Sequence, residues 1–230
     1  MKRFWKHVAV DAERGIRLDE RPLRTPGRVP LVLPTAALAE AVADEWRAVE
    51  DGQEIDPRAM PLTGLGNAAI DRVGADQALF AAGLAHYGES DLLCYRADSP
   101  EDLVARQAAA WDPLLDWARA RYDAHIEVAT GILHRAQPAV TLARLGDAIA
   151  ARDAFTLAAL SPVVTIGGSL IAALALVERA ATAEQVWDAV TLDEEYQAER
   201  WGRDPLAEAG IAARRRDFGG GVRMLELLGD

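Results

Sequence analysis

The chain has 230 residues, half of them hydrophobic, which is enough apolar material for one substantial domain or two small ones. Its net charge of −11 would repel a phosphate backbone, so we expect no nucleic-acid partner. The charge is uneven, because residues 1–35 hold eight Lys and Arg against four Asp and Glu, and the remainder holds 17 against 32. This asymmetry indicates two differently charged parts.

The sequence lacks the patterns of export and of membrane insertion. The start, "MKRFWKHVAVD", has no apolar core of a signal peptide. The longest apolar stretch, "PVVTIGGSLIAALALV" at 162–177, is shorter than the roughly 20 residues that span a bilayer. The single cysteine, Cys94, cannot form an internal disulfide. We therefore expect a cytoplasmic protein that has no membrane partner. We also expect it to be a monomer.

The first 33 residues predict short strands. Apolar and β-branched residues occur at His7–Val10, Ile16–Leu18, Leu23 and Val29–Leu33, and turn-prone glycines and prolines separate these segments. This spacing is typical of hairpins. We expect a small antiparallel sheet.

An amphipathic helix follows the predicted strands. Thr35 is placed to cap it, and Leu38, Val42, Trp46 and Val49 recur every three to four residues while acidic residues fill the other face. A few strands bury too little surface alone, so this helix should cover one face of the sheet.

The loop "DGQEIDPRAMP" at 51–61 is the candidate domain boundary, and helical periodicity dominates beyond it. The fold class we predict is α+β: a small antiparallel β domain with a covering helix at 1–58, then a larger all-helical domain at 59–230. Further helices are expected near 62–72, 76–87, 101–122, 138–152, 168–180, 183–201 and 204–228. Pro113 should interrupt one of them, and the glycine triplet at 219–221 should break the last.

Common catalytic motifs are absent from the sequence. There is no GxxxxGK(S/T) loop, no GxGxxG after a strand and no GxSxG elbow. The histidines fall in different predicted elements, without the short spacing of a metal motif: His7, His86, His125 and His134. Cys94 has apolar neighbours and is interpreted as a buried thiol. We expect no cofactor, no metal and no catalytic residue.

One helix carries a glutamate where apolar residues are expected. In "TAEQVWDAVTLDEEYQAERWG" a stripe at helical spacing comprises Val186, Val190, Glu194, Gln197 and Trp201. Because an unpaired buried carboxylate costs several kcal/mol, Glu194 should either meet an arginine inside the fold or lie where the stripe reaches the surface. Candidate cations are Arg200, Arg203 and Arg214 to Arg216. The neighbouring Asp193 and Glu195 are expected to be solvated.

Seven segments together resemble a known family. In chain order they are "RFWKHVAVD", "LDERPLRTP", "LPTAALAEAVADEW", "MPLTGLGNAAIDRV", "YGESDLLCYRA", "QAAAWDPLLDW" and "LDEEYQAERWGRD". Their order is similar to that in the assembly chaperones that bind the alpha subunit of F1 ATP synthase. The resemblance covers nearly the whole chain. It implies a protein that is not an enzyme, with a small α+β domain before a larger helical one.

The resemblance also implies a function and a site. Family members shield the interface of the unassembled alpha subunit until the beta subunit replaces them. The family's important glutamate precedes a glutamine and a WG pair, a motif that falls here on Glu194, Gln197 and Trp201. With the adjacent Glu195, these are the predicted partner-binding residues. The family works in mitochondria and related bacteria, and the start of this sequence favours a bacterial cytoplasm.

Two other functions remain open from the residues alone. One is a small cytoplasmic hydrolase or transferase that uses Glu194 or Cys94 in an acidic cleft. The other is an acidic adaptor with a different protein partner. Screening for turnover of pooled esters, phosphates and nucleotides would test the first, and affinity capture of the bound partner would test the second.

Overall fold

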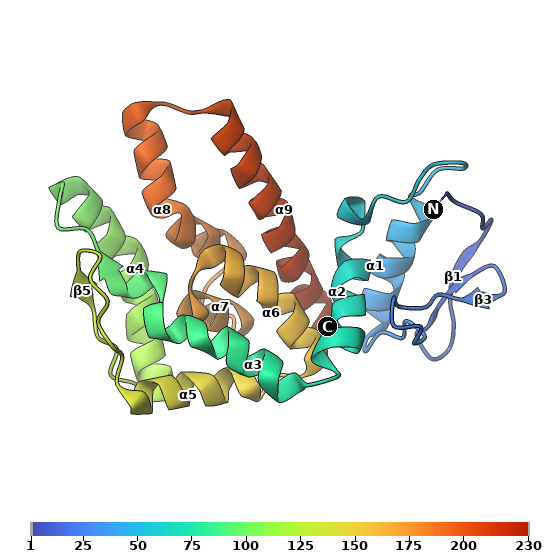
Figure 1. Cartoon of the computed structure of the whole chain (residues 1–230), viewed down its shortest axis with the longest axis horizontal. Coiled ribbons are helices and arrows are strands. Elements are labelled where there is room, and N and C mark those ends of the chain that lie inside the picture. The colour runs from blue at the N-terminus through green and yellow to red at the C-terminus, as the bar shows by residue number, and fades with distance from the viewer. Residues whose placement is uncertain (1, 230) are drawn as a thin grey trace. The chain divides into compact units, whose positions relative to one another are not determined.

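The computed structural model describes residues 2–229 and has an α+β fold, as predicted (Figure 1). The chain divides into two compact units. The small unit comprises the chain as far as Phe80, Asp153–Ala159 and the segment from Gly219 onward. The helical unit comprises Ala81–Arg152 and Leu160–Phe218. Helices α6 (Ala154–Gly167) and α9 (Pro205–Leu228) supply residues to both units.

The small unit contains the predicted antiparallel sheet. Strands β1 (Val8–Val10), β2 (Ile16–Leu18) and β3 (Arg21–Pro22) lie in that order, with Val8 opposite Leu18 and Arg17 opposite Pro22. The strand expected at Val29–Leu33 forms only isolated bridges, one of them from Pro30 to Arg24. Pro30 has no N–H to donate, which removes one hydrogen bond from a ladder in this segment.

The covering helix is confirmed as α1 (Ala36–Arg47). Thr35 caps it, because its hydroxyl oxygen accepts a hydrogen bond of 3.1 Å from the Leu38 N–H. The same hydroxyl donates to the Leu227 carbonyl at 2.7 Å, which ties the end of α9 to the start of α1. The apolar face of α1, including Leu38 and Val42, is fully buried in the core of the small unit.

The small unit extends past the predicted boundary at residue 58. A short 3-10 helix, η1 (Pro57–Ala59), leads into α2 (Pro61–Ala68), which continues as one π-helical turn, η2 (Ala69–Val73). Glu45 on α1 accepts hydrogen bonds from the N–H groups of Leu62 and Thr63 at 2.7 and 2.8 Å. These bonds attach α2 to α1, and Leu62 is buried in the same core as α1 and the sheet. Helix α2 therefore belongs to the small unit.

The helical unit is built around the short buried helix α7 (Leu170–Val177). In addition to parts of α6 and α9, it contains α3 (Gln77–Ala85, of which residues 81–85 belong here), η3 (His86–Ser90), η4 (Leu92–Cys94), α4 (Glu101–Tyr122), α5 (Ala139–Ala150) and α8 (Ala183–Trp201). Helix α7 packs against α4, α5 and α8, and Leu170–Ala175 are all buried. Strands β4 (Tyr95–Arg96) and β5 (Ala129–Thr130) form a parallel pair that the sequence analysis missed.

Buried Asp91 anchors the start of α7. Its carboxylate accepts hydrogen bonds from the N–H groups of Leu93 at 3.1 Å and Ile171 at 2.9 Å. Ser169 caps the same helix, with its hydroxyl 3.0 Å from the Ala172 nitrogen. Burial raises the pKa of Asp91 to about 6, although these hydrogen bonds oppose the shift.

Two predicted helix breaks are wrong. Helix α4 is continuous through Pro113, and α9 is continuous through the glycine triplet. Pro113 is exposed on α4, whereas Trp111 on the buried face donates from its indole to the Ala189 carbonyl at 2.7 Å. The gain from burying such side chains outweighs the lost backbone bond. A Cβ on Gly220 would lie 3.0 Å from the Pro61 Cβ, so glycine permits close packing of α9 on α2.

Helix α6 was not among the predicted helices, and it contains Pro162, a residue that is unfavourable inside a helix. The structure continues the helix through Pro162 and ends it at Gly167. Gly168 then adopts a φ of +63°, a conformation that glycine enters without strain, and this turns the chain into α7.

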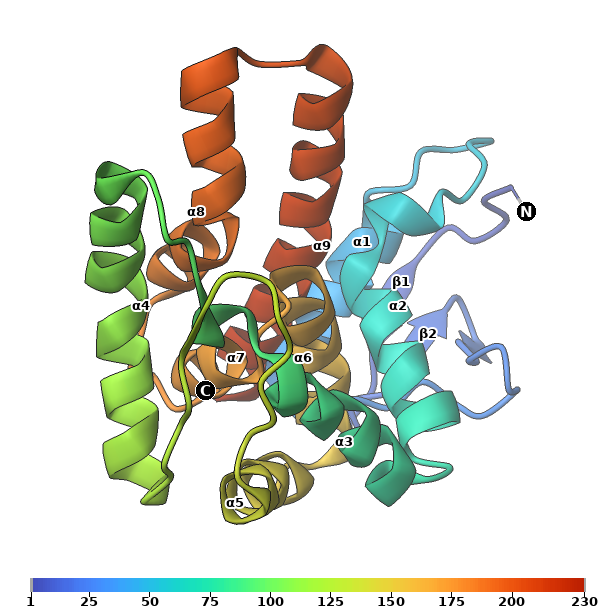
Figure 2. The same ribbon diagram turned by 60° about the vertical axis from the view of Figure 1, so that its left-hand side comes forward.

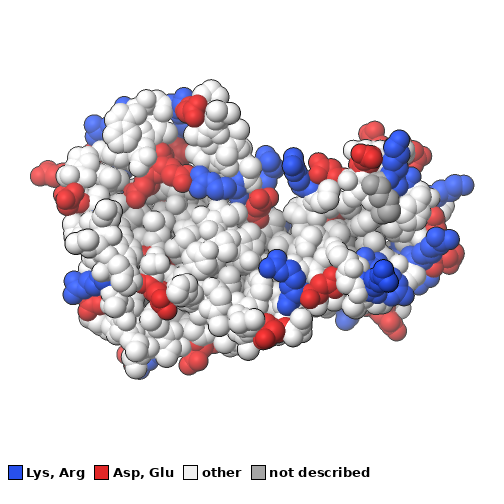
Figure 3. Space-filling view, viewed as in Figure 1, with Lys and Arg blue, Asp and Glu red and all other residues white. Residues whose placement is uncertain are grey.

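The surface seen in Figure 3 is divided in character. Charged side chains of both signs crowd the small unit, on the right of the view, whereas broad uncharged areas lie over the helical unit. Within residues 2–229 no helix has the length and apolarity needed to cross a membrane.

Candidate partner-binding site

Helix α8 positions the predicted site residues, and its boundaries agree with the sequence prediction. A capping box starts it: the Thr182 hydroxyl accepts from the Gln185 N–H at 3.2 Å, and the Gln185 side chain accepts from the Thr182 N–H at 2.8 Å. The helix ends at Gly202, which has a φ of +92°. Trp187, Ala189 and Tyr196 are on its buried side.

The stripe that contains Glu194 leaves the core in the last turns of α8. Val186 is buried and Val190 is half-buried, but Glu194, Gln197 and Trp201 are exposed. The exposed fraction of Trp201 is 79%, which is unusual for so large an apolar side chain. We call these three residues the outer face of α8.

Glu194 has an arginine partner and is nevertheless accessible. The Arg214 guanidinium, on α9, contacts both carboxylate oxygens, with one N–O distance of 2.9 Å. Yet 44% of the Glu194 side chain and 40% of the Arg214 side chain are exposed. The sequence analysis treated an arginine partner and surface exposure as alternatives, whereas the structure combines them. Hydrogen bonding to Glu194 raises the pKa of Arg214 above its ordinary value.

Glu195 belongs to a second ion-pair group at the end of the hairpin formed by α8 and α9. Its carboxylate lies 2.9 Å from Arg203, and the same guanidinium lies 3.5 Å from Glu208. Figures 1 and 2 show α8 and α9 running side by side, with a short connection at one end. These contacts bridge the two helices near that connection.

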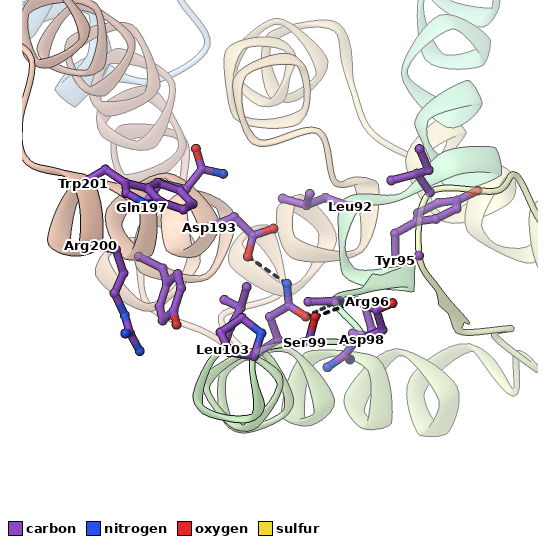
Figure 4. A pocket seen from close by; sticks show the side chains of 16 residues that line it. Leu92, Tyr95, Arg96, Asp98, Ser99, Leu103, Asp193, Gln197, Arg200 and Trp201 are labelled. Atoms are coloured by element: carbon purple, nitrogen blue, oxygen red, sulfur yellow. Dashed lines mark hydrogen bonds between the residues drawn. The ribbon is translucent and has the colours of Figure 1, made fainter.

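Asp193 is a correction to the sequence analysis, which expected a solvated carboxylate. It points toward α4 and accepts a 2.8 Å hydrogen bond from the Gln107 side chain (Figure 4). The Gln107 oxygen in turn accepts from the Ala97 N–H at 2.8 Å. A signal was available, because Gln107 interrupts the apolar spacing of Trp111 and Leu114 on the same helix face.

Tyr196 is a further residue that the sequence analysis missed. Its hydroxyl donates to Asp102 on α4 at 2.9 Å, and Arg200 contacts the same carboxylate. These two hydrogen bonds lower the pKa of Asp102 below its ordinary value. The Arg106 and Arg200 guanidiniums lie over the Tyr196 ring, 5.3 and 5.2 Å from its centroid. These contacts attach the inner side of α8 to α4, and the three residues of the outer face take no part in them.

Two pockets adjoin the outer face of α8. One, of about 570 Å³, lies between α8, the start of α4 and the segments near β4 and β5 (Figure 4). Ile132 contributes to its lining and is 98% exposed. The other, of about 530 Å³, lies between α8 and α9 and is lined by Glu194 and Arg214. Gln197 and Trp201 line both pockets, so the outer face separates two accessible hollows.

Of the two residues considered for catalysis, Glu194 lines one of these pockets and Cys94 lines neither. Cys94 is buried, and this burial raises the pKa of its thiol to about 12, so a reactive thiolate does not form near neutral pH. His125 lies 3.0 Å from Glu127, and His86 lies 3.3 Å from Glu89. Across residues 2–229 no cluster of three or more His, Cys, Asp and Glu could hold a metal ion.

Comparisons with known proteins agree with this picture of the fold. The family described as ATP12 chaperone protein matches residues 2–119. The chain is 24% identical over 215 residues to "Protein atp12, mitochondrial" of Schizosaccharomyces pombe, which covers 87% of this chain and 74% of that protein.

Solved structures match over almost the full chain. The crystal structure of Atp12 from Paracoccus denitrificans has a TM-score of 0.92 and 46% identity, covering 99% of this chain and 98% of the other. The Atu1473 protein of Agrobacterium tumefaciens has a TM-score of 0.90 and 40% identity, covering 99% of this chain and 86% of the other. Helix α8 lies beyond the matched family segment but within the part of the chain covered by these structures.

Proposed function

Because the chain belongs to the ATP12 chaperone family, whose members assist F1 ATP synthase assembly and are not enzymes, we propose that it binds the unassembled alpha subunit. In this proposal the chain shields the alpha-subunit interface until the beta subunit replaces it. The chain acts as a monomer in the bacterial cytoplasm.

The observation that carries the proposal is the outer face of α8. Glu194, Gln197 and exposed Trp201 lie together where the family resemblance locates its binding motif, and two pockets flank them. An exposed tryptophan beside charged groups is typical of contact surfaces in protein complexes. We infer that Glu194, Glu195, Gln197 and Trp201 contact the alpha subunit.

The chemistry of this face suits a temporary complex. Subunit interfaces of permanent assemblies are large and apolar, and they aggregate when exposed. A chaperone must cover such a surface and later yield it, so its contact should be weaker than the final interface. Exposed ion pairs are worth about 0–1 kcal/mol each, and contacts of that kind can be exchanged readily.

Co-expression tests the proposed function. The alpha subunit would be produced alone, with this chain, and with this chain carrying Glu194→Lys, and soluble alpha subunit would be quantified. We expect soluble alpha subunit to increase with the unmodified chain and to fall back with the variant. Equal insolubility in all three cultures would refute the proposal.

A further inference from the structure

The space between α8 and α9 is a groove that is lined in part by residues with small side chains. The residues that line this pocket of about 530 Å³ include Ala198, Ala207 and Gly210, whereas Ile211 and Trp201 supply larger apolar surface. Packed helices normally fill such space with interlocking side chains. Small residues on both helices therefore leave room for a side chain from another molecule.

The Glu194 and Arg214 pair spans this groove. Glu194 comes from α8 and Arg214 from α9, and both line the pocket. Both side chains are about two-fifths exposed, so water reaches the pair and screens its attraction. An incoming cation could replace Arg214 with little net loss, because one exposed ion pair would be exchanged for another.

The groove and its ion pairs carry an excess of acid. The carboxylates in its lining are Glu194, Asp204 and Glu208, and the guanidiniums are Arg203 and Arg214, whereas Glu195 pairs with Arg203 from outside the lining. Arg203 is shared between Glu195 and Glu208, and the Asp204 carboxylate faces the Ala207 N–H at 3.3 Å. The charge complement of this groove is a cation.

We propose that the α8–α9 groove binds a lysine or arginine of the alpha subunit together with an adjacent apolar side chain. In the free chain Arg214 pairs with Glu194, and the incoming cation replaces Arg214 in this ion pair. The inference rests on the proposed function. Arg214 is then an internal competitor for the binding carboxylate. The apolar neighbour of the incoming cation lies against Trp201 and Ile211, where the groove offers apolar surface.

This exchange makes an unusual prediction: removing a charged residue from the site should strengthen binding. In Arg214→Ala the Glu194 carboxylate has lost its competitor, so the dissociation constant for the alpha subunit should fall by up to roughly fivefold, the equivalent of one exposed ion pair. In Glu194→Gln binding weakens. Adding Arg214→Ala to Glu194→Gln should change nothing further, because no carboxylate remains to be released.

The test measures the affinity of the full chain for purified alpha subunit by titration in low and moderate salt. Arg216→Ala is the matched control, since it removes an exposed arginine from the same helix and does not line the groove. Arg214→Met, which keeps an apolar stem, serves if Arg214→Ala alters the melting curve. Tighter binding in Arg214→Ala or Arg214→Met, with Arg216→Ala unchanged, supports the exchange.

The other outcomes separate the two proposals. Failure of the unmodified chain to bind the alpha subunit overturns the proposed function itself. If the unmodified chain binds the alpha subunit, two results overturn the exchange and leave the proposed function in place. One is weaker binding by folded Arg214→Ala, and the other is an affinity that is unchanged by the Arg214 substitutions or by Glu194→Gln.

Discussion

Glu194 illustrates how far a single residue can be interpreted from sequence. Its place on an apolar stripe marked it as unusual, and Arg214 was among the cations considered. Sequence spacing could not show that α9 returns alongside α8, nor that the pair stays 44% and 40% exposed. Asp193 was misjudged for the same reason, because its partner Gln107 comes from a distant helix.

At this residue we predict separate effects on binding and on stability. Glu194→Lys places a cation against Arg214 and should weaken alpha-subunit binding by roughly tenfold or more, the equivalent of about 1.4 kcal/mol. The free energy of unfolding should change by no more than about 1 kcal/mol, because the site is exposed. Binding titrations and urea unfolding measure the two quantities.

Asp188→Lys is the control, since Asp188 is an exposed acid earlier on α8 that lines neither pocket. Equal loss of binding in both variants would show a general charge effect. A large loss of stability in Glu194→Lys alone would return Glu194 to a structural role.

Asp91 predicts a pH dependence of stability. Burial raises its folded pKa to about 6 from an ordinary 3.8, so the folded protein binds this proton more tightly than the unfolded chain. The stabilisation is complete below about pH 4 and is lost as pH rises through 6, with a slope of at most about 1.4 kcal/mol per pH unit. The asparagine side chain in Asp91→Asn does not titrate in this range, so this variant lacks the pH dependence that Asp91 contributes.

Urea unfolding at several pH values would compare the two proteins. The unfolding free energy of the unmodified chain, relative to that of Asp91→Asn, should decrease between pH 4 and 6 and level off above pH 7. A difference that grows with pH over this window would show that the hydrogen bonds from Leu93 and Ile171 outweigh burial.

Among the elements, those with local end signals were predicted best. Thr35 and the apolar spacing after it defined α1, and Thr182 with Gln185 begins α8 at the expected residue. Proline and glycine misled the prediction of α4 and α9, since tertiary packing overrides the local preference there. The pairing of β4 with β5 depends on two residues in each strand, too few for a sequence pattern.

Two adjacent glycines of α9 should respond differently to substitution. A Cβ on Gly219 meets nothing within 4 Å, whereas one on Gly220 meets the Pro61 Cβ at 3.0 Å. Gly219→Ala should therefore stabilise the protein by about 0.5–1 kcal/mol, the usual gain inside a helix. Gly220→Ala should gain less or lose stability, because α2 must shift. Thermal melts of the two variants would decide, and equal stabilisation would refute the close packing.

At the scale of the whole molecule, the fold class was predictable and the composition of the small unit was not. Its core contains Leu62, Ala159, Met224 and Leu227 in addition to the predicted sheet and α1. Segments far apart in sequence thus complete one hydrophobic core, which a boundary drawn at a loop cannot reveal. The predicted division into domains at 1–58 and 59–230 stays a prediction.

The family assignment and the site contribute different parts of the functional account. The similarity to Atp12 structures establishes a chaperone of ATP synthase assembly. The proposed contact with the alpha subunit rests on the exposed face of α8. A hydrogen bond from Tyr196 to Asp102 attaches α8 to α4, and the Glu194–Arg214 ion pair joins it to α9. The proposed exchange of ion pairs at this polar face would account for both binding and release.

Cross-linking from the position of Trp201 tests the central claim most directly. A photoreactive amino acid would replace Trp201, and a second protein would carry it at exposed Leu79 in the small unit for comparison. We predict that position 201 cross-links to free alpha subunit and that this product declines as beta subunit is added. A chain that binds the alpha subunit but yields no product from position 201, or a product that beta subunit leaves undiminished, would contradict the account.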